Sequence, residues 1–98
     1  IFYNAKEAVK NTDVVITDKW ISLHESNKNH KLKELKKFQV NSQLMSLAKK
    51  NAIFLHCLPA SIGKEVTKKV LYGKQSRVYS QAENRISSVK SVIEYCLK

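Results

Sequence analysis

The sequence contains few of the residues that mark several classes of protein. Only two of its 18 basic residues are arginines, Arg77 and Arg85, and it holds two cysteines and one proline, Pro59. Two cysteines make no disulfide framework, so a reducing compartment, the cytoplasm, is expected. No apolar run approaches the ~20 residues that a membrane span needs. We therefore expect no association with a membrane.

The scarcity of arginine also bears on whether the positive net charge indicates nucleic-acid binding. A net charge of +10 suits a nucleic-acid binder, because clustered cations neutralise phosphates. Arginine, however, is the residue that reads phosphates and guanine bidentately, and the lysines here are scattered over every segment. We expect a solvated, lysine-rich surface and no nucleic-acid partner. The densest run, "KNHKLKELKK" at 28–37, keeps a polyanion-binding module open as an alternative.

Metal-ligand spacings are missing as well. No CxxC or HxxxH pair occurs and the three histidines lie far apart, so no metal is expected. The hydrophobic fraction of 43%, with 27% charged residues, is ordinary for a globular protein. The 98 residues suffice for one domain or part of one. Because the sequence begins with Ile1 rather than methionine, we expect a segment of a longer chain.

Helical and extended patterns alternate along the chain. Helices are predicted over 3–12, 32–38, 63–73 and 82–97, and another begins at Asn41 or Ser42 and ends at Asn51. Strands are predicted over 13–17 and 52–57, with a weaker candidate over 76–81, and the segment 18–31 is predicted to be a loop. Strands separated by helices imply a parallel sheet with right-handed crossovers. The predicted fold class is therefore α/β, a parallel sheet flanked by helices.

Reactive side chains follow each predicted strand, namely Asp18, Ser22 and His24 after the first, His56 and Cys57 after the second, and Gln81, Glu83, Asn84 and Arg85 after the third. Ligands of open parallel sheets bind beyond the carboxyl ends of the strands. The convergence therefore predicts a site at this edge. Taken singly, His56 also suits a buried, hydrogen-bonded histidine, and Cys57 an inert small hydrophobe.

Pro59 bears on how the second strand ends. It removes one backbone donor and is expected to hold Leu58 in an extended conformation. The segment "HCLP" is therefore predicted to be a rigid, extended exit that presents backbone carbonyls and a thiol at fixed positions. The stripe of Ile86, Val89, Ile93 and Cys96 on the last helix is predicted to pack in the core.

Several motifs together resemble the ornithine carbamoyltransferases, namely "HCLPA" at 56–60, "GKEVT" at 63–67, "QAENR" at 81–85, "DVVITDKWIS" at 13–22 and "FQVN" at 38–41. The similarity covers essentially the whole chain. It implies a family that joins a carbamoyl-phosphate domain to an ornithine domain, and it identifies 1–98 as the C-terminal part of the ornithine-binding domain. The expected fold is then a partial domain of a Rossmann-like three-layer sandwich, with the carbamoyl-phosphate-binding domain absent from this chain.

The resemblance implies a reaction and the residues on its ornithine side. The carbamoyl group of carbamoyl phosphate would pass to the δ-amino group of L-ornithine, giving L-citrulline and phosphate, with no metal or organic cofactor. Asp18 would hold the amino group of ornithine, and Ser22 and Leu23 would contact its amino-acid end. The full-length enzyme would be a homotrimer whose N-terminal domain supplies the other half of the site.

The resemblance also implies the residues at which the two substrates meet. Cys57 and Leu58 would line the meeting point. Arg85 would bind carbamoyl phosphate and, together with His56, favour the charge that develops on its carbonyl oxygen. Cys57, Arg85 and His56 are therefore the expected catalytic residues.

Two departures from the family's pattern keep alternatives open. Where the family usually reads Ser-Met-Gly, this chain has Ser22, Leu23 and His24, and histidine in place of glycine restricts the backbone. The possibility of a relative that uses another amine, such as putrescine, therefore remains open. An aspartate-specific relative is disfavoured because "HCLPA" is not the usual sequence of that branch at this position. No Ser-Thr-Arg-Thr type phosphate-binding segment occurs, so the chain alone is expected to be inactive, and a truncated domain without catalysis remains open.

Overall fold

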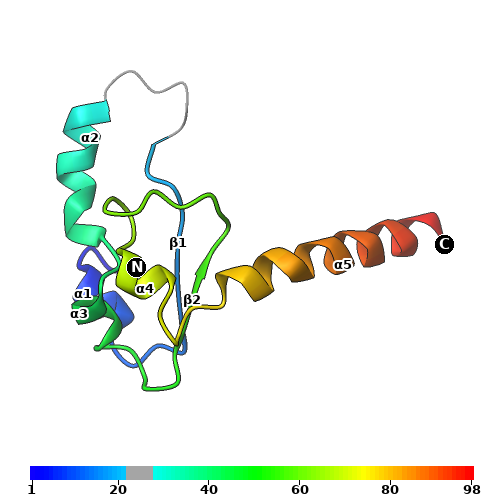
Figure 1. The fold of residues 1–98 in the computed structure, drawn as a ribbon, viewed down its shortest axis with the longest axis horizontal. Helices are drawn as coiled ribbons and strands as arrows, with labels where there is room; N and C mark the ends of the chain where they lie inside the picture. Colours follow the sequence, from blue (N-terminus) through cyan, green and yellow to red (C-terminus); the bar gives the residue numbers. More distant parts are fainter. Residues whose placement is uncertain (22–27) are drawn as a thin grey trace.

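The computed structural model describes residues 1–21 and 28–98. Its elements, labelled in Figure 1, are α1 (Ala5–Val9), β1 (Val14–Thr17), α2 (Lys28–Leu35), the 3-10 helix η1 (Lys36–Phe38), α3 (Ser42–Met45), β2 (Ile53–His56), α4 (Lys68–Leu71) and α5 (Val78–Leu97). The helices α1, α3 and α4 lie beside the strands, whereas α5 extends away from the rest of the molecule (Figure 1).

The sheet is parallel, as the sequence predicts. β1 and β2 pair in register from Val14 opposite Ile53 to Thr17 opposite His56. On the other edge of β2, Phe54 N donates to Gln75 O at 2.8 Å and receives a bond at its own carbonyl from Arg77 N at 2.9 Å. The α/β class with a parallel sheet flanked by helices is therefore confirmed.

The core lies between β2 and the short helices. A cluster of buried hydrophobic side chains fills it, namely Val15, Val40, Leu44, Met45, Phe54, Val66, Val70, Leu71 and Val78. Asn41 begins α3 as predicted, because its side chain accepts a hydrogen bond from Leu44 N at 2.9 Å. Along β2, Phe54 and His56 are buried and the alternate residues are half-buried, so one face of the strand is fully covered and the other only in part.

Three of the predicted helices are shorter in the structure, among them the one predicted over 3–12, which is Ala5–Val9. Val66 lies in an extended segment that bridges Val40, with Val40 N donating to Glu65 O at 2.9 Å, so α4 begins only at Lys68 and not at residue 63. α3 ends at Met45, well before Asn51. Gly73 follows α4 in close approach to it, since a Cβ there would lie 2.6 Å from Lys69 O. In contrast, α2 begins inside the segment predicted as a loop.

The prediction of a third strand over 76–81 is wrong. Ser76 makes one parallel bridge to Phe54, and the chain turns into α5 at Val78. Val78 is the buried residue of this helix. Beyond its first turns the apolar stripe is exposed, with Ile86 at 70% and Ile93 at 53% of full accessibility, so its predicted core packing is wrong as well. Cys96 is exposed too.

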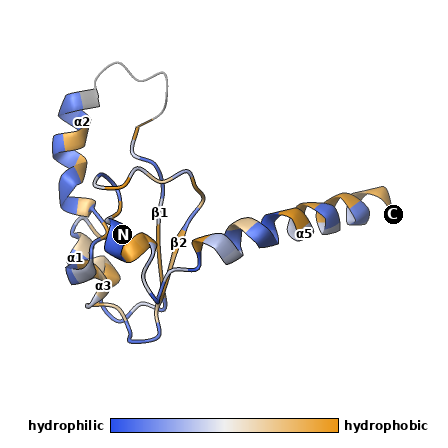
Figure 2. Ribbon diagram, viewed as in Figure 1, coloured by the Kyte–Doolittle hydropathy of each residue, from blue (hydrophilic) through white to orange (hydrophobic). Residues whose placement is uncertain are grey.

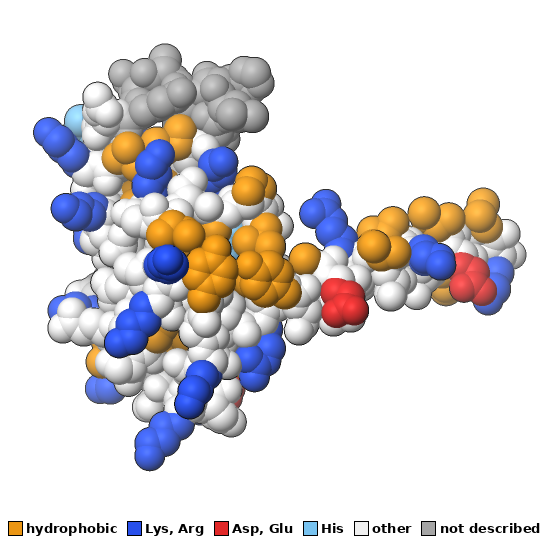
Figure 3. Space-filling model, in the orientation of Figure 1, with side chains coloured by type: hydrophobic (Ala, Val, Ile, Leu, Met, Phe, Trp, Pro, Cys, Tyr) orange, Lys and Arg blue, Asp and Glu red, His pale blue; other side chains and the backbone are white. Residues whose placement is uncertain are grey.

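Colour by hydropathy shows orange, apolar segments recurring along the length of α5 (Figure 2). The space-filling view shows apolar side chains in a row along its outer part, and lysines and arginines spread over the rest of the visible face (Figure 3). In the described ranges, 1–21 and 28–98, no helix has both the length and the apolar character needed to cross a membrane.

Candidate functional site

The two strands end side by side, and their exits carry a carboxylate and a thiol. Because Thr17 lies opposite His56, the residues that follow them, Asp18 and Cys57, are neighbours. Cys57 Sγ donates a hydrogen bond to Asp18 Oδ1 at 2.9 Å. The structure thus brings together two of the residues predicted for the site, one from each strand end.

The hydrogen bond changes the acidity of both partners. The bond from Cys57, helped by one from Lys19 N at 2.6 Å, lowers the pKa of the Asp18 carboxyl. The same bond raises the pKa of the Cys57 thiol, because Asp18 stabilises the protonated form, while the charge of Arg85 acts in the opposite direction on this pKa. At neutral pH the pair therefore consists of an Asp18 carboxylate and a protonated Cys57 thiol, joined by a hydrogen bond.

The first turns of α5 bring Arg85 to the same place. A cavity of about 300 Å³ is lined by His56, Cys57, Gln81, Ala82 and Arg85. Gln81 and Arg85 are one helical turn apart, so they share a face of α5. Gln81 was predicted to end a third strand, with a helix beginning at Ala82. In the structure the whole motif "QAENR" lies in α5, and it meets the carboxyl end of β2.

One ring nitrogen of His56 is hydrogen-bonded, and the other lies beside a buried carboxylate. The ring is buried, Nδ1 accepts a hydrogen bond from Leu58 N at 2.8 Å, and Nε2 lies 3.3 Å from Glu65 Oε1 without the alignment of a hydrogen bond. An acceptor at Nδ1 carries no proton, so the proton of the neutral ring is on Nε2. His56 is one of the residues that line the cavity, and its expected role at the substrate carbonyl stays a prediction.

Leu58 departs from the extended conformation that was predicted for it. Its φ is +55°, in the left-handed region. The turn it makes lets its N–H reach back to His56 Nδ1, which fixes the exit from β2. Glu65 supports the same exit from the next segment, since its Oε1 accepts a hydrogen bond from Ser61 N.

The remaining predicted site residues, Ser22 and Leu23, lie outside the described residues, as does His24. Among residues 1–21 and 28–98, no group of three or more His, Cys, Asp or Glu side chains is arranged to hold a metal ion. The contacts of Ser22 and Leu23 with ornithine therefore stay a prediction.

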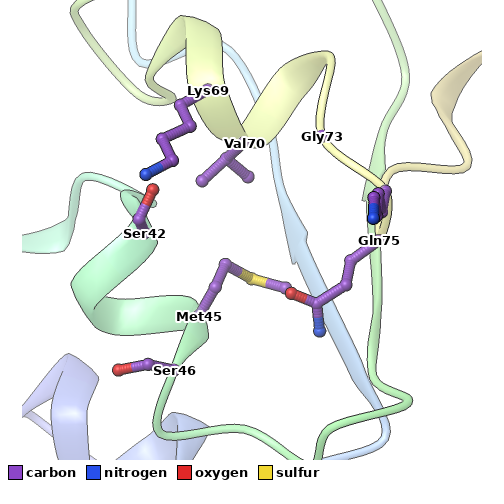
Figure 4. A pocket seen from close by; sticks show the side chains of 8 residues that line it. Ser42, Met45, Ser46, Lys69, Val70, Gly73 and Gln75 are labelled. Carbon is purple, nitrogen blue, oxygen red and sulfur yellow. The ribbon is translucent and has the colours of Figure 1, made fainter.

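A second cavity, of about 400 Å³, lies between α3 and α4 (Figure 4). Lys69 and Ser42 face each other at one side of it, and Met45 and Val70 line its interior. It lies toward the amino ends of the strands, because Gln75 in its wall bonds to Ala52 O, just before β2. The predicted site residues are not among its lining residues, so the candidate site is the smaller cavity at Cys57.

Sequence reasoning missed Glu65, which stands in the motif "GKEVT" but received no role. Gln81 was placed at the predicted edge with Arg85, but its bond to the backbone of His56 was not foreseen. A glutamate flanked by lysine and valine gives no sign of being fully buried, and a glutamine one turn before Arg85 is found only once the segment is known to be helical.

A carboxylate, a thiol and a guanidinium at the carboxyl edge of a parallel sheet define an α/β domain with a ligand site at its strand ends. The sequence profile of the aspartate/ornithine carbamoyltransferase Asp/Orn binding domain matches residues 1–96. The chain belongs to this family.

The relatives are named as ornithine carbamoyltransferases. One from Rhodopseudomonas palustris is 49% identical over 92 residues, and one from Methanococcus maripaludis is 53% identical over 90 residues, which cover 94% and 90% of this chain respectively. The chain spans only 30% of the length of each.

Solved structures of the same name share the fold. The ornithine carbamoyltransferase from Campylobacter jejuni superposes with a TM-score of 0.88 at 41% identity, over 96% of this chain and 31% of its own. That from Thermus thermophilus gives 0.87 at 37% identity, over 99% of this chain and 31% of its own.

Proposed function

We propose that this chain supplies the ornithine side of a carbamoyl-transfer site. The reaction passes the carbamoyl group of carbamoyl phosphate to the δ-amino group of L-ornithine and releases L-citrulline and phosphate. The observation that carries the proposal is the Cys57–Asp18 hydrogen bond at the strand ends, with Arg85 on the wall of the same cavity. The names of the relatives support the choice of substrates.

The nucleophile is the neutral amine, and this determines what its binding site must do. A free alkyl amine has a pKa of about 10.4, so ornithine arrives as an ammonium ion. The Asp18 carboxylate, whose pKa is lowered, attracts this cation. Cys57 lies within hydrogen-bond distance of the same carboxylate and is placed to take part in the movement of the proton as the amine attacks. No bond to sulfur is required.

Attack at the carbonyl carbon places negative charge on the carbonyl oxygen, and a tetrahedral intermediate then expels phosphate. Arg85 is the cation on the cavity wall that meets this charge and the phosphate. One such donor is typically worth ~3–4 kcal/mol in the transition state. Leu58, in the turn after Cys57, offers backbone groups at the meeting point of the substrates. We assign His56 to holding this turn in place, through its bond from Leu58 N.

The finer features of the whole protein are part of the same proposal. We propose that 1–98 is the C-terminal part of the ornithine-binding domain, that a separate N-terminal domain binds carbamoyl phosphate, and that the full-length enzyme is a cytoplasmic homotrimer. The small share of the relatives' length that the chain spans supports a further domain. Ser22 and Leu23 are proposed to contact the amino-acid end of ornithine.

The test is citrulline formation by the longest polypeptide that contains this segment. Cys57→Ala and Arg85→Ala are each expected to abolish most of the turnover, whereas Lys50→Ala, at an exposed residue before β2, leaves it unchanged. A folded polypeptide that forms no citrulline would overturn the ornithine assignment. Carbamoylation of putrescine in place of ornithine would move the proposal to another amine.

A further inference from the structure

The backbone N–H of His56 lies at the end of β2, where its hydrogen-bond acceptor is a side chain and not the backbone of a neighbouring strand. On this edge of β2, Phe54 bonds to the backbone of Gln75 and Arg77. Because strand residues repeat with a period of two, the next N–H that points to this edge is that of His56. The chain has by then turned into α5, which begins at Val78, so no backbone carbonyl of a third strand is available at this position.

The side chain of Gln81 fills the missing position. Its Oε1 accepts the hydrogen bond from His56 N at 3.1 Å. His56 is 1% exposed, so its N–H needs a partner within the protein. Gln81 thus continues the hydrogen-bond ladder of β2 by one step, from a helix rather than from a strand.

The same bond fixes the direction of α5. Val78 is the buried residue of this helix, and most of the later ones are exposed. The polar ties between the start of α5 and β2 that the described residues provide are the bond from Arg77 N to Phe54 O and the bond at Gln81. Arg85 lies one turn beyond Gln81 on the same face, so its place on the cavity wall depends on this second tie.

We propose that Gln81 is a positioning residue: by accepting the His56 N–H it holds the first turns of α5 against the end of β2, and so keeps Arg85 beside Cys57. This inference rests on the proposed function for its kinetic consequence. Its structural consequence, the proximity of Arg85 to the thiol, does not depend on any reaction. The groups that face Cys57 are Asp18 from the exit of β1, Arg85 from α5 and the adjacent His56.

The test compares Gln81→Met, which keeps the length but loses the acceptor, with Gln81→Glu, which keeps an acceptor oxygen. The matched control is Gln43→Met, at an exposed glutamine of α3. In the longest available polypeptide, Gln81→Met is expected to lower kcat by about 10- to 100-fold, with a smaller change in the KM for ornithine. Gln81→Glu should stay within about threefold of the wild type and Gln43→Met should not differ from it.

A second readout follows the thiol itself. The rate of iodoacetamide alkylation of Cys57 is measured against pH by mass spectrometry of the tryptic peptide 51–64. Loss of the nearby guanidinium should move the profile to higher pH in Gln81→Met, in the direction given by Arg85→Met, and not in Gln43→Met. Gln81→Glu is compared by kcat alone, because its carboxylate would itself raise the pKa of the thiol. If the wild type forms no citrulline, the proposed function fails, and this profile still decides the role of Gln81.

A Gln81→Met protein with the kcat and the alkylation profile of the wild type would overturn the proposal. So would a folded Gln81→Glu protein that is impaired as much as Gln81→Met, because the acceptor would then not be the cause. Should Gln81→Met fail to fold, hydrogen exchange of the His56 amide in the wild type decides. Slow exchange, comparable to that of Phe54, supports the bond, and fast exchange contradicts it.

Discussion

The body of the molecule, residues 1–21 and 28–76, and the outer part of α5, residues 86–97, differ in how far their apolar side chains are buried. In the body, Phe54 and Val66 are fully buried. In the outer part of α5, Ile86 and Ile93 are more than half exposed on a regular stripe. An exposed apolar stripe of this kind marks a surface made for contact. The comparison teaches that the body encloses its own core, whereas the apolar stripe of outer α5 has no cover among the described residues.

The largest effect should follow truncation in the body. Phe54→Ala removes a fully buried ring from the centre of the core and is expected to lower the free energy of unfolding by ~3–5 kcal/mol. Urea denaturation of the 98-residue chain, followed by circular dichroism, measures this. A loss below about 1 kcal/mol would mean that the body is not the folded unit of the chain.

A smaller effect is expected at a helix cap in the body. Asn41→Ala leaves the N–H of Leu44 without its side-chain acceptor and should cost ~1 kcal/mol. Asn41→Ser, which keeps an acceptor oxygen, is the matched control and should recover most of the loss. The same denaturation experiment compares the two. Equal losses in both variants would contradict a capping role for Asn41.

The two regions also shift the pKa of the Cys57 thiol in opposite directions. The pH dependence of its alkylation separates the two effects. Asp18, from the body, is the main cause of the raised pKa of the thiol, and Arg85, from α5, lowers it. Asp18→Asn should therefore lower this pKa and speed alkylation at pH 8 several-fold. Arg85→Met should slow it by a smaller factor. Asp13→Asn, which breaks an exposed ion pair with Lys49, should leave the rate unchanged.

The sign of the stability effect follows from the same shifts. The folded pKa of Asp18 is lowered, so its contribution to stability is present above its unfolded pKa and is lost as the pH falls through the folded value. The folded pKa of Cys57 is raised, so its contribution is lost as the pH rises above 9.0. Both groups are solvent-accessible, and the effects on stability are small. Asp18→Asn should make the alkaline limb shallower, and an unchanged limb would contradict the coupling.

The smallest effect is expected in outer α5. Ile93→Ala should change the free energy of unfolding of the 98-residue chain by less than ~0.5 kcal/mol, because the side chain is exposed. In a longer polypeptide that covers α5, the same substitution should cost more. A loss above about 1.5 kcal/mol in the 98-residue chain would show that the stripe is already packed, and light scattering would then test for a second copy.

Local patterns in the sequence were enough for the class of fold and for both strands. The β-branched run before Asp18 and the apolar run before Cys57 mark β1 and β2, and Asn41 marks the start of α3. Their common edge, where Asp18 and Cys57 meet, followed from the rule for parallel sheets.

What the sequence did not predict depends on partners distant along the chain. Val66 stands in a run, 63–73, whose pattern predicts a helix, yet its segment is extended because Val40 pairs with it. Val78 stands in a run typical of a strand, but the helix begins there, and Gln81 takes over the bond that a strand would have made. The turn at Leu58 depends on the nitrogen of a histidine ring, which no local propensity reports.

The hydrogen bond between Cys57 and Asp18 also bears on oxidation. Peroxides attack the thiolate, and an accessible cysteine with a low pKa is soon converted to a sulfenic acid. Cys57 is accessible, but the carboxylate beside it keeps the sulfur protonated. Asp18 therefore lowers the fraction of Cys57 present as thiolate, and the same bond that joins the two strand ends slows the attack of oxidants on the thiol.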